Sequence, residues 1–157
     1  MSAPSPSPVF RAPMRSRDDT VDHAAALAWA FEHDLCGVGE RGDGGDTTDA
    51  RVQARAERFA AAPAGAFVWT QDAAGVYRLG RITGEATYDE SPVARRHDLP
   101  HQRPCAWLPG PVPEPELPAA VRQTFARGGR NFQRINPATT PGDVEAETAV
   151  LWERYAD

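Results

Sequence analysis

One of two candidate binding surfaces lies between positions 122 and 134, where cationic, amide and aromatic side chains gather around two adjacent glycines. They are Arg122, Arg127, Arg130, Asn131, Phe132, Gln133 and Arg134. Guanidinium groups bind phosphate, aromatic rings stack on bases, and amides satisfy base edges. This composition predicts a surface that combines phosphate contact with base stacking. The alternative is an amphipathic helix with its polar face in water, followed by a strand whose Phe132 is buried.

His97, Asp98 and His101 form a second group, since imidazole and carboxylate together suit zinc or another transition metal. The cluster supplies two imidazoles and one carboxylate, and no further strong ligand has an obvious place nearby. A metal-dependent hydrolase that uses these residues is therefore the third of our functional hypotheses. We assign no metal site and no cofactor.

Other catalytic arrangements are missing from the sequence. The chain contains no lysine, so it has no phosphate-binding Gly-x-x-x-x-Gly-Lys loop, and it has no Gly-x-Ser-x-Gly nucleophile turn. Cys36 and Cys105 each lie in an apolar stretch and are expected to be buried thiols. The sequence favours a non-catalytic protein while leaving enzymatic activity open.

The 157 residues suit one domain, and their formal net charge of −5 argues against a protein that wraps duplex DNA. Residues 1–91 hold nine arginines and fourteen acidic residues, residues 92–134 hold seven and three, and residues 135–157 hold one and five. The middle stretch allows a local basic face, and scattered solvated arginines are the alternative. Because no apolar run approaches the roughly 20 residues of a membrane-spanning helix and the N-terminus lacks a secretory signal, we expect a cytoplasmic protein with no membrane partner.

Residues 1–8 are rich in serine and proline and predict a disordered tail, followed by a single domain at 9–157. The clearest sheet signal is a hairpin of residues 66–71 and 76–84, joined by a polar connection that ends in glycine. Further strands are expected at 9–12, 35–39, 86–89, 101–108 and 131–135. Helices are expected after Asp18, after Asp49, after Pro118 and near Asp143, with a polar glycine-rich loop at 40–50.

Four short motifs within residues 34–108 carry a resemblance to a known family. They are Cys36-Gly37-Val38-Gly39 at a turn, Gly65-Ala66-Phe67-Val68-Trp69 at a strand start, Leu79-Gly80-Arg81-Ile82 at a returning strand, and Ala86-Thr87-Tyr88-Asp89 at a connector. This arrangement resembles the PUA-like superfamily, specifically its EVE-like and restriction-system N-terminal domains. The resemblance implies an α+β fold with a small mixed or antiparallel, barrel-like sheet and flanking helices. Ala66 departs from the family, which has an acidic residue at that position.

The resemblance further implies a pocket for a modified base, flipped out of a nucleic acid and held against aromatic faces. Its expected lining residues are Gly37, Val38, Trp69, Thr70, Gln71, Tyr77 and Trp107. The expected phosphate contacts are Arg95, Arg96, Arg103, Arg127, Arg130 and Arg134. For Trp69, Tyr77 and Trp107 the alternative is ordinary core packing.

The leading hypothesis is a non-catalytic nucleic-acid-binding module, with DNA or RNA left undecided, that works with a separate effector protein. The alternative is a protein-interaction or small-ligand-sensing module on the same scaffold. A nucleic-acid binder would gather its arginines on the face that opens the Trp69 pocket, whereas an interaction module would show an apolar patch there.

Overall fold

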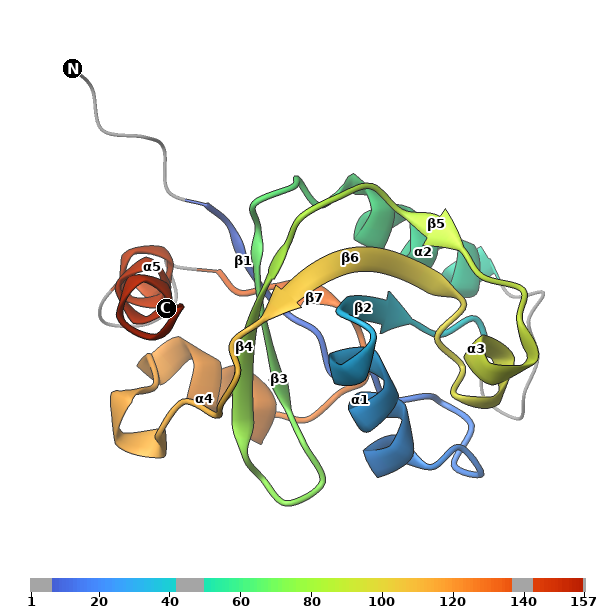
Figure 1. The fold of residues 1–157 in the computed structure, drawn as a ribbon, viewed down its shortest axis with the longest axis horizontal. Helices are drawn as coiled ribbons and strands as arrows, with labels where there is room; N and C mark the ends of the chain where they lie inside the picture. Colours follow the sequence, from blue (N-terminus) through green and yellow to red (C-terminus); the bar gives the residue numbers. More distant parts are fainter. Residues whose placement is uncertain (1–6, 42–49, 137–142, 157) are drawn as a thin grey trace.

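The computed structural model describes residues 7–41, 50–136 and 143–156, and within these ranges the chain folds as a mixed α+β domain (Figure 1). Its strands are β1 Val9–Arg11, β2 Leu35–Val38, β3 Phe67–Gln71, β4 Tyr77–Ile82, β5 Thr87–Tyr88, β6 His101–Trp107 and β7 Gln133–Arg134. Its α-helices are α1 His23–Glu32, α2 Ala50–Ala61, α3 Pro92–Arg96, α4 Ala119–Ala126 and α5 Val144–Tyr155. The strands form one strongly curled sheet in the order β2-β6-β4-β3-β1-β7, with β5 paired to β6.

The hairpin of β3 and β4 forms the centre of this sheet. The two strands pair antiparallel, with Trp69 opposite Leu79. The Asp72 side chain closes the turn by accepting hydrogen bonds from the backbone N–H groups of Ala74 and Val76, and Gly75 adopts a positive φ of 83°. The hairpin predicted from the sequence is confirmed.

Strand β1 lies between β3 and β7 in the sheet. It pairs parallel with β3, with Val9 opposite Phe67, and antiparallel with β7, with Phe10 opposite Arg134. The residues that follow β1 therefore lie beside those that surround β7, although more than 100 positions separate them in sequence. The antiparallel pairing of β1 with β7 places the candidate site described below.

Helices cover the two faces of the sheet and create two separate cores. Because side chains alternate along a strand, Val68 of β3 enters one core, built with α1, α2 and Phe132, while Phe67 and Trp69 enter the other, built with α4 and α5. Figure 1 shows α4 and α5 together at one end of the sheet, away from α1, α2 and α3.

Several sequence expectations need correction. Helix α1 begins later than the start expected after Asp18, because Asp22 caps it, and it buries Ala26, Leu27 and Ala30. Ala24 and Ala28 of the same helix are exposed. Helix α3 was not expected at all, because its five residues are too few to show a helical period.

Two predicted segments fall largely outside the described residues, namely most of the tail at 1–8 and most of the loop at 40–50 with its capping Asp49. Within the described part of the chain, none of the helices has the length and apolar character needed to cross a bilayer.

Candidate functional site

The pocket expected around Trp69 is closed in this structure. The Trp69 side chain has 0% exposure, and its indole N–H donates to Thr148 Oγ1 of α5 at 3.2 Å. Tyr77 is buried against Phe125, with the rings edge to face at 5.6 Å. Trp107 donates its indole N–H to the Leu35 carbonyl at 2.9 Å. These three aromatic residues pack as the alternative interpretation described, and a base has no access to Trp69.

The remaining pocket residues are divided among three regions. Thr70 follows Trp69 into the interior, and its Oγ1 has no hydrogen-bond partner within the described chain. Gln71 turns toward its own hairpin, where its amide nitrogen donates to the Gly75 carbonyl at 3.4 Å. Gly37 and Val38 of the expected set line a surface pocket.

The six arginines expected to contact phosphate also occupy different environments. Arg103 is 3% exposed and donates to the carbonyls of Gly84, Phe59 and Ala60, so its guanidinium stabilises the fold and does not reach a ligand. Arg95 and Arg96 lie exposed on α3. The other three, Arg127, Arg130 and Arg134, line surface hollows.

Three adjoining hollows share one face, which we call the arginine face. The inner pocket is lined by Ala12, Pro13, Met14, Arg15, Arg17, Gly37, Val38, Gly39, Arg41, Arg55, Asp98, Arg130 and Phe132. The arginine hollow is lined by Arg17, Arg51, Ala54, Arg55, Arg58 and Asn131. The outer groove is lined by Pro8, Phe10, Arg58, Ala61, Ala62, Pro63, Asn131, Phe132, Gln133 and Arg134. The hollows are neighbours, since each shares lining residues with the other two.

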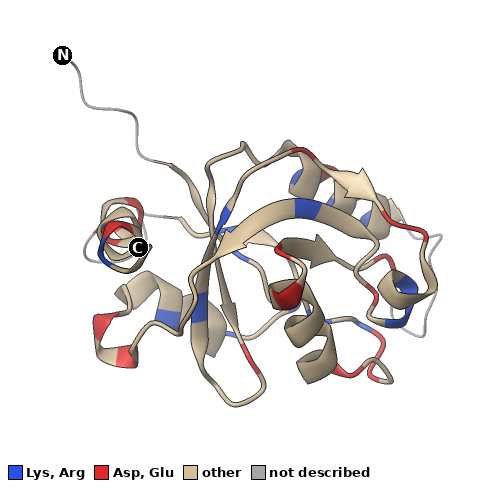
Figure 2. Ribbon diagram, in the orientation of Figure 1, with Lys and Arg blue, Asp and Glu red and all other residues tan. Residues whose placement is uncertain are grey.

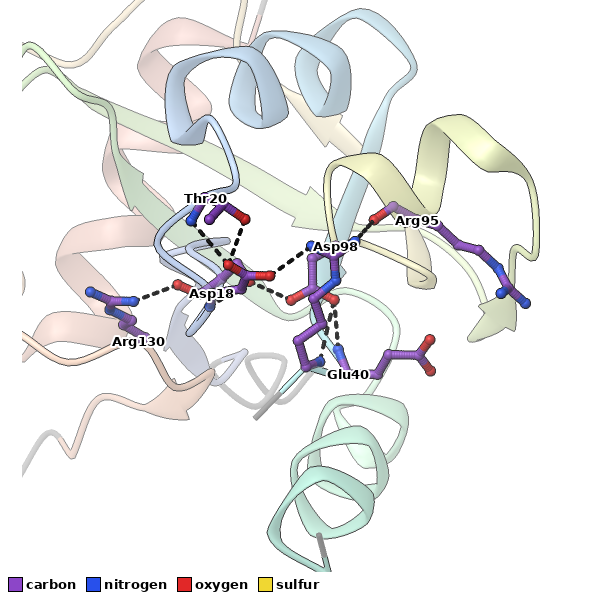
Figure 3. Close-up of polar contacts among 8 residues, drawn as sticks. Asp18, Thr20, Glu40, Arg95, Asp98 and Arg130 are labelled. Atoms are coloured by element: carbon purple, nitrogen blue, oxygen red, sulfur yellow. Dashed lines mark hydrogen bonds and ion pairs between the residues drawn. The ribbon is translucent and has the colours of Figure 1, made fainter. Parts of the chain in front are cut away.

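Asp98 organises the floor of the inner pocket (Figure 3). Its carboxylate accepts hydrogen bonds from Ser16 Oγ at 2.6 Å and from the backbone N–H groups of Glu40 and Arg41 at 3.0 and 3.4 Å. A side chain on Gly39 would meet this carboxylate, since an added Cβ would lie 2.4 Å from Asp98 Oδ2. Burial raises the pKa of Asp98, although these hydrogen bonds and the charge of Arg41 oppose the shift.

The two histidines that flank Asp98 in sequence do not join it in a metal site. His97 packs on the Trp29 ring at 5.3 Å, and His101 lies against Tyr88 and 3.9 Å from a Glu40 oxygen. Over the described ranges, His, Cys, Asp and Glu side chains form no group of three that could hold a metal ion. The geometry therefore gives no support to the hydrolase hypothesis.

Ion pairs hold several arginines at the rim of the inner pocket. Arg41 pairs with Asp18 at 3.0 Å and also donates to the Arg95 carbonyl. Arg130 pairs with Asp19 at 2.9 Å and donates to the Ser16 carbonyl at 2.7 Å. Figure 3 shows the turn at Asp18 lying between Arg130 and Asp98. These ion pairs hold the Arg41 and Arg130 side chains in place and partly neutralise their charges.

Helix α2 supplies the arginine hollow. Arg51, Arg55 and Arg58 are spaced by four and three residues, which places them on one side of the helix, while Val52 and Phe59 are buried. Figure 2 shows basic positions along α2, behind the curled sheet. Sequence reasoning missed these arginines because it used α2 only for its apolar positions, although the same spacing also marked the cationic stripe.

The outer groove has a volume of about 640 Å³ and an aromatic floor. The Phe10 and Phe132 rings stack at 4.7 Å with an interplanar angle of 12°, and Phe59 supports Phe132 edge to face at 5.0 Å. Phe10 is half-buried, so part of its ring is accessible. Four of the seven residues that the sequence marked as a mixed aromatic and polar surface line this groove, namely Asn131, Phe132, Gln133 and Arg134. Phe132 is nevertheless buried, as the alternative interpretation described.

Comparison with known proteins does not identify the chain. No model of a known protein family matches it. No curated protein matches it significantly either.

Proposed function

We propose that the protein is a non-catalytic module that binds a single-stranded nucleic acid across the arginine face, with one base in the outer groove. The observation that carries this proposal is the charge of the face. Its three hollows are lined by eight arginines and by one carboxylate, that of Asp98. Three hydrogen bonds already engage that carboxylate inside the molecule. The lining is thus rich in arginine although the whole chain carries a net charge of −5, and ion pairs with Asp18, Asp19 and Glu145 partly neutralise Arg41, Arg130 and Arg134.

A single strand fits these hollows better than a duplex. The stripe of Arg51, Arg55 and Arg58 extends about 10 Å along α2 at 1.5 Å per residue, which suits contact with successive phosphates of one strand. The neighbouring groove is large enough for a base and offers the Phe10 ring for stacking. Asn131 and Gln133 carry amides that can pair with a base edge. A base paired inside a duplex could not enter it.

We extend the proposal to the PUA-like superfamily. The strongly curled sheet with flanking helices supports this assignment. The inner pocket is lined in part by Gly37 and Val38, which agrees with the pocket turn that the resemblance implies. A modified base is the ligand we expect at this face, in a cytoplasmic protein whose output depends on a separate effector.

The test is equilibrium binding, by fluorescence anisotropy at low salt, to single-stranded DNA and RNA oligonucleotides with and without common base modifications. We expect the double variant Arg55→Gln/Arg58→Gln to weaken binding roughly tenfold, because it removes two phosphate contacts. The matched control is Arg122→Gln/Arg154→Gln, which removes the same charge from α4 and α5, outside the three hollows. Equal weakening by the two double variants would contradict the proposal.

Phe10→Leu separates stacking from charge. It should weaken binding by about 1–3 kcal/mol, the usual contribution of one stacked base, while leaving the salt dependence unchanged. Circular dichroism of the variant verifies that the sheet remains folded. Full affinity in this variant would contradict the placement of a base in the groove.

A small-ligand-sensing module is the second candidate, and the size of the outer groove favours it. A volume of about 640 Å³ lies within the range of small-molecule sites, roughly 300–1,000 Å³. This candidate gains support if no oligonucleotide binds while a neutral aromatic compound does.

A further inference from the structure

A fourth hollow lies across β7 from the outer groove. We call it the α4 pocket, and its volume is about 290 Å³. It is lined by Arg11, Ala120, Thr124, Arg127, Gly128, Gln133, Arg134, Ile135 and Asn136. Both hollows are lined by Gln133 and Arg134, the two residues of β7. A nucleic-acid strand lying in the groove can therefore continue directly into the α4 pocket.

The unusual member of this pocket is Arg11, a cation that is 8% exposed. Its Nε donates to the Asn131 carbonyl at 3.2 Å, and its Nη1 donates to the carbonyls of Thr124 and Gly128 at 3.2 and 2.8 Å. Among the described residues Nη2 makes no hydrogen bond, and Arg11 forms no ion pair. A buried guanidinium usually faces a carboxylate. Arg11 faces none among the described residues, so its positive charge is uncompensated there.

The other charges of the pocket have the same sign. Arg127 is exposed, and its side chain has no hydrogen bond or ion pair within the described ranges. Burial and the nearby charge of Arg127 both lower the pKa of Arg11, as expected where cations gather without an anion. Arg134 is partly neutralised by Glu145, which pairs with it at 2.8 Å. No carboxylate lines the pocket in the described part of the chain.

We propose that the α4 pocket binds a phosphate monoester, the terminal phosphate of the strand that lies on the arginine face. This inference rests on the proposed function. A monoester carries a charge of about −1.5 to −2 at pH 7, which compensates several arginines better than a singly charged internal phosphodiester does. Gln133 and Thr124 border the pocket as additional hydrogen-bonding groups. The site therefore recognises the end of a strand and fixes its direction on the face.

The experiment compares three oligonucleotides of one sequence, with a 5′-phosphate, a 3′-phosphate or neither. We expect one phosphorylated end to bind about tenfold tighter than the unphosphorylated strand. Arg127→Gln should abolish that preference, whereas Arg122→Gln, on the same helix outside the pocket, should retain it. Equal affinity for the three oligonucleotides, or a preference that survives Arg127→Gln, would overturn the inference.

The double variant Arg55→Gln/Arg58→Gln distinguishes this inference from the proposed function. It should weaken all three oligonucleotides together and leave the ratio between them unchanged, because its residues lie outside the α4 pocket. If no oligonucleotide binds, the proposed function fails and inorganic phosphate tests the pocket directly. Phosphate should then raise the midpoint of thermal unfolding of the wild type, relative to chloride at equal ionic strength. The midpoint of Arg127→Gln should be the same in phosphate and chloride. Equal midpoints would overturn the pocket as well.

Discussion

Two regions of this molecule contain the groups that nucleic-acid recognition requires, and only one of them is accessible. Around Trp69 the aromatic rings are large, but α4 and α5 cover them. On the arginine face the rings are smaller, but Phe10 is half-buried and arginines surround it. The comparison shows that an aromatic residue in a strand gains its role from the helix packed over it, and not from its position in a motif.

The arginines, like the aromatic residues, divide into buried side chains and exposed ones. Arg11 and Arg103 are buried and donate mainly to backbone carbonyls, so they connect segments of the fold. Arg51 and Arg58 project from α2 and are exposed. Residue type alone does not separate these groups, whereas the cost of burying a charge does, because each buried guanidinium needs several acceptors.

The largest effect is expected from Trp69→Ala. This change leaves a cavity between β3 and α5 and removes the hydrogen bond to Thr148, so it should lower the free energy of unfolding by about 3–5 kcal/mol in urea. Trp69→Phe, which keeps most of the volume, should lower it much less. A Trp69→Ala variant that unfolds like the wild type and selectively loses oligonucleotide binding would reverse our comparison of the two regions.

Arg103→Met and Arg58→Met form a matched pair that separates structural from ligand-facing arginines. Arg103→Met removes the donor from three carbonyls, two on α2 and one at Gly84, and should destabilise the protein by about 2–3 kcal/mol. Arg58→Met, at an exposed position, should change stability by less than about 0.5 kcal/mol. Oligonucleotide affinity, measured where both variants are folded, should follow the opposite order. The same order for stability and affinity would contradict the division.

A smaller effect, dependent on pH, is expected from Asp98. Burial raises its pKa in the folded protein above the unfolded value near 3.8, so the folded state holds the proton more tightly. Stability from this group is therefore fully present below pH 3.8 and is lost as the pH rises through the folded pKa.

Asp98→Asn removes this dependence. The stability of the wild type relative to the variant should increase as the pH is lowered from neutral toward 3.8, measured by urea unfolding at several pH values. Although burial lowers the pKa of His101, the charge of Asp98 raises it, so both proteins carry His101→Gln to exclude that titration from the difference. A stability difference between the two proteins that does not vary with pH would show that folding does not raise the pKa of Asp98.

Local patterns in the sequence predicted most of the elements. The turn at Asp72 and Gly75 identified the β3–β4 hairpin, and Asp143 begins α5 as expected, with its side chain accepting from Glu145 and Ala146. The parallel pairing of β1 with β3 could not be predicted, because it joins distant segments through backbone hydrogen bonds that carry no residue signature.

The candidate site was predicted only in part for the same reason. The cluster at Asn131, Phe132, Gln133 and Arg134 was visible as a local composition. Its partner Phe10 was not, since only the β1–β7 pairing brings the two rings together. The expectation that Trp69 lines an open pocket was wrong, because the sequence of a strand indicates which residues share a face but not which helix covers that face.

The most direct test of the account is the salt dependence of binding to a single-stranded oligonucleotide. The slope of log K against log salt concentration should become shallower by about 1.4 in Arg55→Gln/Arg58→Gln than in the wild type, because each lost phosphate contact contributes about 0.7 for a single strand. The Arg122→Gln/Arg154→Gln control should keep the wild-type slope. Unchanged slopes in both variants would show that the arginine face does not contact the nucleic acid.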